Sequence, residues 1–295
     1  MNPRIYVIEN EKHLLEITNM GDNVTQLIFP GGEPYVKLPH STLRDSDVLI
    51  DARVGSMDEW GLLWATMEAL LPIPTRNVYL FLPYFPGARG DRVEYGDGTA
   101  LAAVMYAQLL NAYDLDRVFI VDPHSDVAPS AIDKVEVFTV ADLLPAALLP
   151  TYDALICPDL GARKRTEAAA KALGIETVIQ GFKHRDMKTG QLSGFSIEDI
   201  PEDVAQLLVV DDICDGGGTF VGLLEEALIA TPDIVVDLWV THGIFSKGPE
   251  VLKKFNGVYY TDSFPSRFSA AVGNATSFHK LDLMSVLADK IIERL

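Results

Sequence analysis

A group of carboxylates directly follows an apolar run in the second half of the chain. Leu207–Val210 has the continuous apolar character of a buried strand, Asp211 and Asp212 come immediately after it, and Asp215 follows three residues after Asp212. Carboxylates at the end of a strand can accept hydrogen bonds from sugar hydroxyl groups, directly or through Mg²⁺. The spacing therefore predicts a site for a sugar at this strand end.

Three glycines and a threonine, Gly216, Gly217, Gly218 and Thr219, lead from these carboxylates into a helical pattern. Glycine allows close approach of the backbone and positive φ, so successive amides can turn toward one anion. A helix N-terminus adds partial positive charge, and Thr219 can cap the helix and donate a hydrogen bond. A bare glycine triplet is usually only a tight turn. Between paired carboxylates and a helix start, it predicts a phosphate cradle that needs no lysine.

The elements that must position this loop alternate along the chain. The expected strands are Arg4–Ile8, Val48–Asp51, Val78–Leu82, Arg117–Val121, Ala154–Cys157, Thr177–Ile179, Leu207–Val210 and Ile234–Val240. The expected helices are Asp58–Leu71, Gly98–Asn111, Arg163–Leu173, Thr219–Ala230, Pro249–Phe255 and Leu281–Arg294. Short apolar runs rich in Val and Ile, separated by longer helical patterns, predict an α/β fold with mostly parallel sheets flanked by helices.

The chain also carries a weak internal repeat. Val121–Asp126 and Val210–Asp215 both read V-D-x-x-x-D after an apolar run. If the repeat is real, it means two related α/β domains, the second of which keeps a glycine-rich loop that the first has lost. The segment Ala141–Tyr152, with two prolines, is a plausible junction. We expect domains at residues 1–140 and 141–295, with the last helix a candidate to pack on the first domain.

The charge of the chain limits its partners. It has 295 residues, 24 Lys and Arg against 42 Asp and Glu, and a formal net charge of −18. Such a chain repels a phosphate backbone at long range, so binding to nucleic acids and to anionic membranes is not expected. The first residues lack the pattern of a signal peptide, and no apolar stretch approaches the roughly 18 residues of a membrane span. We therefore expect a cytoplasmic protein.

The glycine loop resembles the phosphoribosyl-diphosphate motif of type I phosphoribosyltransferase folds. Four further segments occur in the order and spacing of one family, ribose-phosphate diphosphokinase: Leu82–Arg92, Val121–His124, Cys157–Arg165 and Val240–Ser246. The resemblance covers the chain from about Phe29 to the C-terminus. It implies two tandem phosphoribosyltransferase-like domains, a nucleotide side in the first and a ribose 5-phosphate side in the second.

The resemblance implies a reaction. In that family O1 of ribose 5-phosphate attacks the β-phosphorus of Mg-ATP, giving phosphoribosyl diphosphate and AMP, so ATP and ribose 5-phosphate are the expected partners and Mg²⁺ the expected cofactor. A homo-oligomer is also implied. The ribose 5-phosphate site falls on Asp211, Asp212, Asp215, Gly216, Gly217, Gly218 and Thr219.

The resemblance also assigns residues elsewhere. Lys183 and Arg185 match a catalytic loop that closes over the phosphates, with Lys183 stabilising the transition state. The residues that match the ATP site are Phe29, Glu33, Arg89, Asp91 and His124, and those linked to metal are His124 and Asp159. The chain departs from the family pattern at Gly31 and Gly90, both close to nucleotide-recognition positions.

Two other functions remain open at this point. A phosphoribosyltransferase, which displaces diphosphate with a base, would use the same glycine loop. The length of the chain, the Arg89 and His124 segments and the Lys183 segment favour the diphosphokinase. A catalytically silent regulatory subunit would have lost a cation or a carboxylate of the reacting centre, whereas Lys183, Arg185 and the expected carboxylates are all present.

Overall fold

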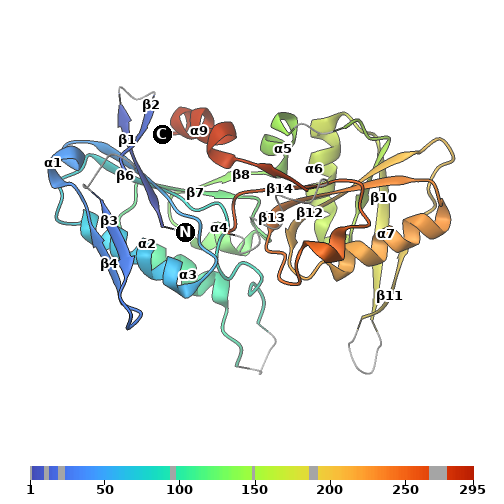
Figure 1. The fold of residues 1–295 in the computed structure, drawn as a ribbon, viewed down its shortest axis with the longest axis horizontal. Coiled ribbons are helices and arrows are strands. Elements are labelled where there is room, and N and C mark those ends of the chain that lie inside the picture. Colours follow the sequence, from blue (N-terminus) through green and yellow to red (C-terminus); the bar gives the residue numbers. More distant parts are fainter. Residues whose placement is uncertain are drawn as a thin grey trace. The chain divides into compact units, whose positions relative to one another are not determined.

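A computed structural model describes residues 2–9, 13–18, 24–93, 98–147, 150–185, 192–265 and 278–295 (Figure 1). The chain divides into two compact units. Unit 1 holds residues 1–138, 263–265 and 283–295, and unit 2 holds residues 139–262 and 266–282. The last helix, α9 (Leu283–Glu293), therefore belongs to unit 1.

Unit 1 is built on a six-stranded sheet in the order β2-β1-β5-β6-β7-β8. Its strands are β1 (Arg4–Glu9), β2 (His13–Glu16), β5 (Asp47–Asp51), β6 (Asn77–Phe81), β7 (Arg117–Val121) and β8 (Val135–Phe138). β5 to β8 are parallel, and β1 is antiparallel to both β2 and β5. A separate hairpin is formed by β3 (Thr25–Ile28) and β4 (Pro34–Lys37).

Helices cover both faces of the unit 1 sheet. α2 (Met57–Leu70) and α3 (Ala102–Asn111) bury their apolar residues in one core with β5, β6 and β7. α9 lies on the opposite side of the sheet (Figure 1). The short helices are α1 (His40–Leu43) and α4 (Val127–Ala131). Buried on both sides, the parallel strands carry the continuous apolar runs visible in the sequence.

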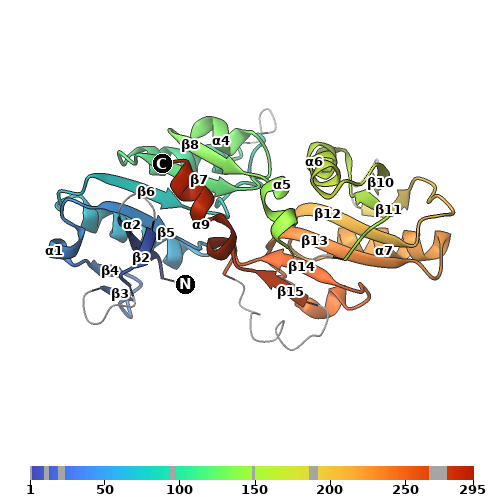
Figure 2. The same ribbon diagram turned by 90° about the horizontal axis from the view of Figure 1, so that it is seen from above.

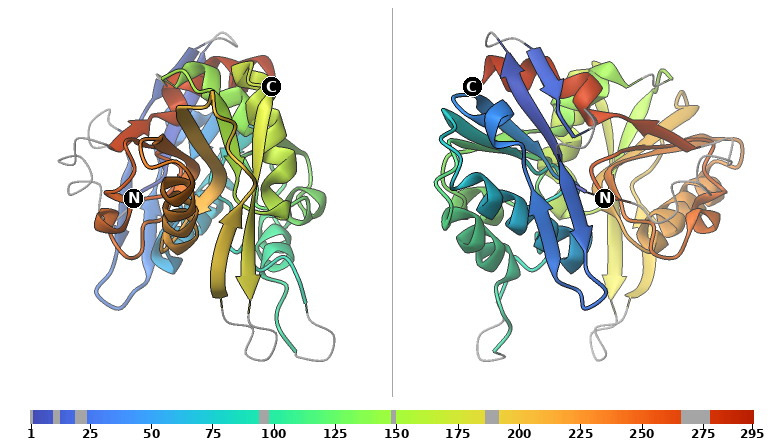
Figure 3. Two further views of the ribbon diagram at one scale, coloured as in Figure 1. Left: turned by 90° about the vertical axis from the view of Figure 1, so that its right-hand side faces the viewer. Right: turned by 60° about the vertical axis from the view of Figure 1, so that its left-hand side comes forward.

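Unit 2 has a seven-stranded sheet in the order β11-β10-β9-β12-β13-β14-β15. Its strands are β9 (Ala154–Cys157), β10 (Thr177–Arg185), β11 (Leu192–Ile197), β12 (Gln206–Cys214), β13 (Val235–Gly243), β14 (Val258–Thr261) and β15 (Phe278–Leu281). All neighbours are parallel except β10 and β11, which form an antiparallel hairpin (Figure 3). β11 is thus an edge strand that pairs with β10 alone.

The helices of unit 2 lie on opposite faces of its sheet (Figure 2). α6 (Arg163–Leu173) covers one face and α7 (Gly218–Ala230) the other. α7 packs its apolar side into the core formed by β9, β12 and β13. The shorter elements are α5 (Val140–Leu143), η1 (Leu144–Ala146), η2 (Leu160–Ala162) and η3 (Pro249–Leu252).

The predicted α/β class with mostly parallel, helix-flanked sheets is confirmed. Three elements, Arg117–Val121, Ala154–Cys157 and Arg163–Leu173, have the predicted bounds. Two helix predictions were wrong in extent. The helix expected from Gly98 begins at Ala102, and Pro249–Phe255 contributes only the 3₁₀ turn η3. Within the described ranges no helix is both long enough and apolar enough to span a bilayer.

Candidate active site

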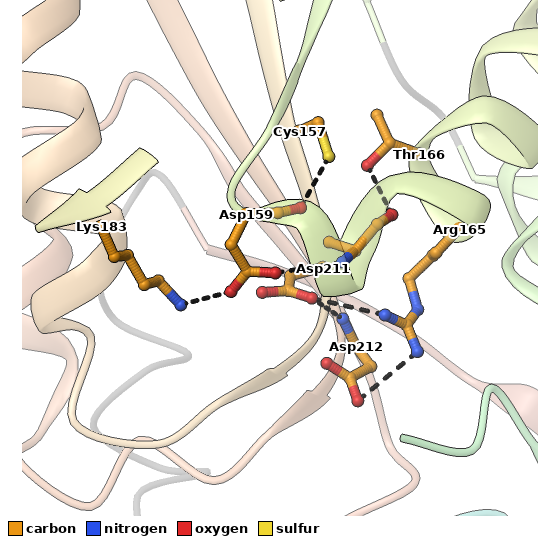
Figure 4. Close-up of polar contacts among 8 residues, drawn as sticks. Cys157, Asp159, Arg165, Thr166, Lys183, Asp211 and Asp212 are labelled. Carbon is orange, nitrogen blue, oxygen red and sulfur yellow. Dashed lines mark hydrogen bonds and ion pairs between the residues drawn. The ribbon is translucent and has the colours of Figure 1, made fainter. Parts of the chain in front are cut away.

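Polar side chains of unit 2 gather where neighbouring parallel strands end. β10, β9 and β12 are adjacent in the sheet, and β9 leads to Asp159 while β12 leads to the glycine loop. The carboxyl ends of parallel strands meet at one edge of a sheet, which is where open α/β sheets bind ligands. Five of the side chains there form two groups held by ion pairs and hydrogen bonds, Asp159 with Lys183 and Arg165 with Asp211 and Asp212 (Figure 4).

The Asp159 carboxylate is held by hydrogen bonds within unit 2. It is the N-cap residue of η2, and its Oδ1 accepts a hydrogen bond from the Ala162 backbone N–H at 3.1 Å. Its Oδ2 accepts a hydrogen bond from the Lys183 Nζ at 2.6 Å. Burial raises the pKa of the Asp159 carboxyl, but the hydrogen bond and charge of Lys183 outweigh it, so the net shift of the pKa is downward. Asp159 is therefore ionised in this arrangement.

Lys183 lies in a strand, and its prediction as a loop residue was wrong. β10 continues through Arg185, and Lys183 pairs with Phe195 of β11 in the antiparallel ladder. The reason is the hairpin: β11 supplies backbone partners that a single apolar run of three residues, Thr177–Ile179, did not reveal. Arg185 is the last residue of β10 and pairs with Leu192. The side chain of Arg185 lies outside the described part of the chain.

Asp211 and Asp212 also lie within a strand, since β12 extends to Cys214, so their prediction beyond the strand end was wrong. Arg165 bridges them: Nη1 lies 3.5 Å from Asp211 Oδ1, and Nη2 lies 3.5 Å from Asp212 Oδ2. All three side chains are largely buried, with exposed fractions of 11% for Arg165, 14% for Asp211 and 4% for Asp212. Burial and the neighbouring Asp212 charge raise the pKa of Asp211, and Arg165 opposes both.

Arg165 is a functional candidate that sequence reasoning missed. It lies in the first turn of α6, within a segment that resembles the diphosphokinase pattern but in which only Asp159 received a role. The available signal was an arginine at a helix start that follows a strand end. Its partners are 46 and 47 residues away in the sequence, and only the adjacency of β9 and β12 brings them together.

The glycine loop is short, and its geometry corrects one prediction. Gly217 is the N-cap residue of α7, with φ +76°, a left-handed conformation that glycine adopts readily. α7 starts at Gly218, so Thr219 lies inside the first turn and does not cap the helix. Gly218 has open space where a side chain would be. The loop therefore presents beside Asp215 the amides of a helix start, which lack partners within the helix, as an anion cradle requires.

The sequence predicts a phosphate cradle without lysine, but in the structure a lysine lies against the glycine loop. A β-carbon built on Gly216 would lie 3.3 Å from both Cδ and Cε of Lys247, so the aliphatic stem of this lysine runs across the loop. The backbone N–H of Ser246 donates to the Asp215 carbonyl at 3.0 Å, which ties the Lys247 segment to the loop. Lys247 follows the segment Val240–Ser246 directly, but its place beside Gly216 could not be read from spacing.

Phe29 and Glu33 occupy the turn of the β3–β4 hairpin in unit 1. The Phe29 N–H donates to the Glu33 carbonyl at 2.9 Å, and the N–H of Gly32, which has φ +90°, donates to the Phe29 carbonyl at 2.8 Å. The Phe29 ring is 46% exposed and lies 5.8 Å from the ring of Tyr35. An exposed aromatic ring on a hydrogen-bonded turn can stack on a flat ligand.

Arg89, Asp91 and His124 are the other unit 1 candidates. Arg89 and His124 are exposed, and His124 follows β7. The Asp91 side chain is 8% exposed and pairs with Arg92 at 3.8 Å, whereas the Arg92 side chain is 90% exposed. A β-carbon at the neighbouring Gly90 would lie 2.8 Å from Cβ of Ala102, so the start of α3 leaves no room for a larger residue there.

The donor set suits Mg²⁺ carried by a substrate. Within the described ranges no group of three or more His, Cys, Asp or Glu side chains could hold a metal ion. Mg²⁺ is usually bound by one or two carboxylates together with substrate phosphates and water, so a single carboxylate is sufficient on the protein side. The Asp159 side chain, 36% exposed, offers such an oxygen ligand.

Comparison with known proteins identifies the family. No family model matches the chain. The chain is 30% identical over 226 residues to a ribose-phosphate pyrophosphokinase of Maricaulis maris, covering 74% of this chain and 71% of that protein. It is 30% identical over 234 residues to the enzyme of Bradyrhizobium diazoefficiens, covering 76% and 71%, and 26% identical over 278 residues to that of Pyrococcus abyssi, covering 88% and 91%.

The fold agrees with these relatives. The structure superposes on phosphoribosylpyrophosphate synthetase from Mycobacterium smegmatis with a TM-score of 0.74 at 22% identity, over 92% of this chain and 89% of that one. The two units with mostly parallel sheets have the phosphoribosyltransferase-like architecture predicted from the sequence. The chain belongs to the ribose-phosphate pyrophosphokinase family, whose members transfer diphosphate groups.

Proposed function

We propose that the protein transfers the β,γ-diphosphoryl group of ATP to O1 of ribose 5-phosphate, giving phosphoribosyl diphosphate and AMP. The observation that carries the proposal is the pair of charged groups at the carboxyl ends of β10, β9 and β12. Lys183 pairs with Asp159, and Arg165 pairs with Asp211 and Asp212, beside the glycine loop. Family membership supports the same reaction.

The loop and the two aspartates form the sugar-phosphate side of this proposal. The amides at the start of α7, from Gly216 to Thr219 beside Asp215, would hold the 5-phosphate, and Lys247 would add a cation to the same cradle. Asp211 and Asp212, kept in place by Arg165, would accept hydrogen bonds from the ribose hydroxyl groups. Recognition then depends on short-range donors and acceptors, as expected in a chain with a net charge of −18.

Lys183 is the proposed catalytic cation. Its ammonium would stabilise the negative charge on the diphosphoryl group as that group moves between two oxygens in line. Arg185, two residues after Lys183 in the same strand, is proposed to assist. The protein needs no covalent intermediate, because positioning and charge neutralisation account for most catalysis of phosphoryl transfer.

Unit 1 supplies the proposed nucleotide side. Phe29 would stack on the adenine and Glu33 would contact the same base region, while Arg89, Asp91 and His124 would contact the phosphates. Asp159 and His124 are the proposed contacts to Mg²⁺, which neutralises phosphate charge when bound. The family resemblance supports these roles, together with a cytoplasmic homo-oligomer and domains at residues 1–140 and 141–295.

A mixing assay tests the proposal. Purified protein is incubated with Mg²⁺, ATP and ribose 5-phosphate, and the nucleotide products are separated by chromatography. AMP that forms only in the presence of ribose 5-phosphate is the expected result. ADP would mean transfer of the γ-phosphoryl group and would refute the reaction. Absence of product with retained binding of phosphoribosyl diphosphate would point to a phosphoribosyltransferase or a silent subunit.

Lys183→Ala separates catalysis from binding in this assay. We expect turnover to fall by at least about 10²-fold, the usual effect of removing one electrostatic stabiliser, with little change in the affinity for ribose 5-phosphate measured by calorimetry. Lys171→Ala, which removes an exposed lysine of α6, is the matched control and should leave turnover unchanged. Equal losses of turnover and affinity for Lys183→Ala would show a ground-state contact instead.

A further inference from the structure

The β10–β11 hairpin is attached to helix α7 by two glycine contacts of opposite direction. In one contact a side chain of the hairpin lies on a glycine of the helix, and in the other a side chain of the helix lies on a glycine of the hairpin. The four residues are Gly222 and Leu223, which are neighbours in α7, Gly181 of β10 and Phe195 of β11.

The first contact joins Gly222 and Phe195. A β-carbon built on Gly222 would lie 2.7 Å from Cγ of Phe195 and nearer still to Cδ2 and Cε2 of the same ring. Real β-carbons do not approach other atoms this closely, so the ring rests directly on the helix backbone. Glycine is a poor residue for a helix interior, and its presence in the second turn of α7 is explained by this contact.

The second contact runs the other way. A β-carbon built on Gly181 would lie 2.8 Å from Cδ2 of Leu223 and 2.9 Å from the Cys157 carbonyl oxygen. Leu223 is fully buried, and it belongs to the core in which α7 packs on β9 and β12. The two contacts together fix how closely the hairpin approaches helix α7 and where along the helix it lies.

Lys183 lies at the centre of this arrangement. It is two residues after Gly181 in β10, and Phe195 is its register partner across the ladder. Residues two apart in a strand, and residues directly opposite in an antiparallel pair, face the same side of the sheet. Lys183, Gly181 and Phe195 therefore share the face that packs on α7, and the first residues of the same helix form the glycine loop.

We propose that Gly222 and Phe195 are positioning residues that set the distance between the Lys183 ammonium and the phosphate-binding loop. The inference rests on the proposed function only in that Lys183 acts on the transferred group. If a side chain is added at Gly222, we expect the β10–β11 hairpin to move and helix α7 to stay in place. β11 is an edge strand that pairs in the sheet with β10 alone, whereas α7 is anchored by its buried residues in the core over the central strands.

Gly222→Ala is the test. The added methyl group collides with the Phe195 ring and displaces the hairpin, while the glycine loop keeps its place at the start of α7. We expect kcat to fall about 10²-fold, as misplacement of a catalytic group by about 1 Å can produce, with the calorimetric Kd for ribose 5-phosphate changed by less than about 3-fold. A loss of affinity as large as the loss of kcat would overturn the inference.

Two further variants make the result specific. Phe195→Ala removes all three ring atoms that the new methyl group meets, so the Gly222→Ala/Phe195→Ala protein should be more active than Gly222→Ala alone. Effects that add in the logarithm of kcat would overturn the proposal. Gly61→Ala is the control: it makes the same change inside helix α2, where the nearest atom is Cγ of Pro34 at 3.5 Å, and it should leave kcat unchanged.

Hydrogen exchange distinguishes this inference from the proposed function. Amides of Thr177–Arg185 and Leu192–Ile197 should exchange faster in Gly222→Ala than in the wild type, and the double variant should show slower exchange than Gly222→Ala. This readout requires no catalytic activity. If the wild type forms no AMP, the proposed function fails while the exchange data still decide whether Gly222 seats the hairpin. Unchanged exchange in Gly222→Ala would overturn the seating itself.

Discussion

Replacing Arg165 by methionine is the most direct perturbation of the charge arrangement at the site. Arg165 lies 3.5 Å from a carboxylate oxygen of Asp211 and 3.5 Å from one of Asp212, so its guanidinium pairs with both carboxylates. Methionine keeps an unbranched, mostly apolar side chain, shorter than that of arginine by two atoms, and removes the charge. The change leaves two largely buried, neighbouring carboxylates without the guanidinium that holds them together.

The magnitude follows from burial. Removing one partner of a buried ion pair costs about 3–5 kcal/mol, because the remaining charge stays buried without compensation. The side chains here are 11%, 14% and 4% exposed and the distances are at the long end for an ion pair, so the low end applies. We expect Arg165→Met to lower the free energy of unfolding by about 3 kcal/mol, about a hundredfold in the folded-to-unfolded ratio.

Arg163 provides a matched control on the same helix turn. It pairs with Glu167 at 2.9 Å, but the two side chains are 55% and 56% exposed. Exposed pairs of this spacing contribute only about 0.3–0.5 kcal/mol. Arg163 also donates to the Gln180 side chain at 3.4 Å, so Arg163→Met should cost at most about 1 kcal/mol.

Urea unfolding of wild type, Arg165→Met and Arg163→Met checks the comparison, with calorimetric titration of ribose 5-phosphate as the second readout. Only Arg165→Met should also weaken sugar-phosphate binding. Adding Asp211→Asn to Arg165→Met removes one of the two opposed carboxylates and should recover stability. Equal losses of stability in the two arginine variants would refute the reasoning that Arg165 neutralises this pair of carboxylates. A double variant less stable than Arg165→Met would refute it as well.

Two further predictions concern the opposite, N-terminal side of β9. Tyr152 donates to Asp237 Oδ2 at 2.7 Å in a buried site, so Tyr152→Phe should lower the free energy of unfolding in urea by about 1–3 kcal/mol; a loss below about 0.5 kcal/mol would contradict this. Asp153 accepts the backbone N–H groups of Ala205 and Gln206, both at 2.9 Å, and these bonds lower its pKa. A carboxyl whose pKa is lowered by folding stabilises the fold at pH values above its unfolded-state pKa of about 3.9. This stabilisation is lost as the pH falls through the pKa of the folded state. Asp153→Ala should therefore be destabilised at pH 7 but approach the wild type in acid, and a difference independent of pH would contradict the argument.

The central strands could be predicted because they are buried on both faces. Val118–Val121 and Ala154–Cys157 are almost wholly inaccessible, and such strands show an unbroken apolar run. The hairpin strands β2 and β4 have half-buried or exposed residues, and residues 194–197 of β11 are half-buried, so their sequences lack that run. Their pairing is set by a partner strand and a turn, which single-segment patterns do not encode.

The same reasoning explains the errors at the site. β12 was expected to end at Val210 because two charged residues follow, yet the strand continues through Asp211 and Asp212 to Cys214. Charged residues can continue a buried strand when a cation compensates them, and here the cation comes from a helix that follows a different strand. Lys183 was expected in a loop for a related reason, since β11 and Phe195 extend β10 beyond its apolar run.

The charges at the site explain how a strongly acidic chain can bind an anion. Asp159, Asp211 and Asp212 are matched within unit 2 by Lys183 and Arg165, and the stem of Lys247 crosses the adjoining loop. With Asp215 beside the loop, four carboxylates and three cations lie at the site, whereas the whole chain carries −18. Because most of the local negative charge is compensated, an incoming phosphate meets amides and ammonium groups and only a small net negative charge at short range. Two of these cations also depend on elements far from them in the sequence: Lys183 on the seating of Phe195 against α7, and Arg165 on the adjacency of β9 and β12. The affinity of such a site is thus a property of the packing that fixes its few cations, and removing one of them should be felt more strongly than any change in the exposed acidic residues.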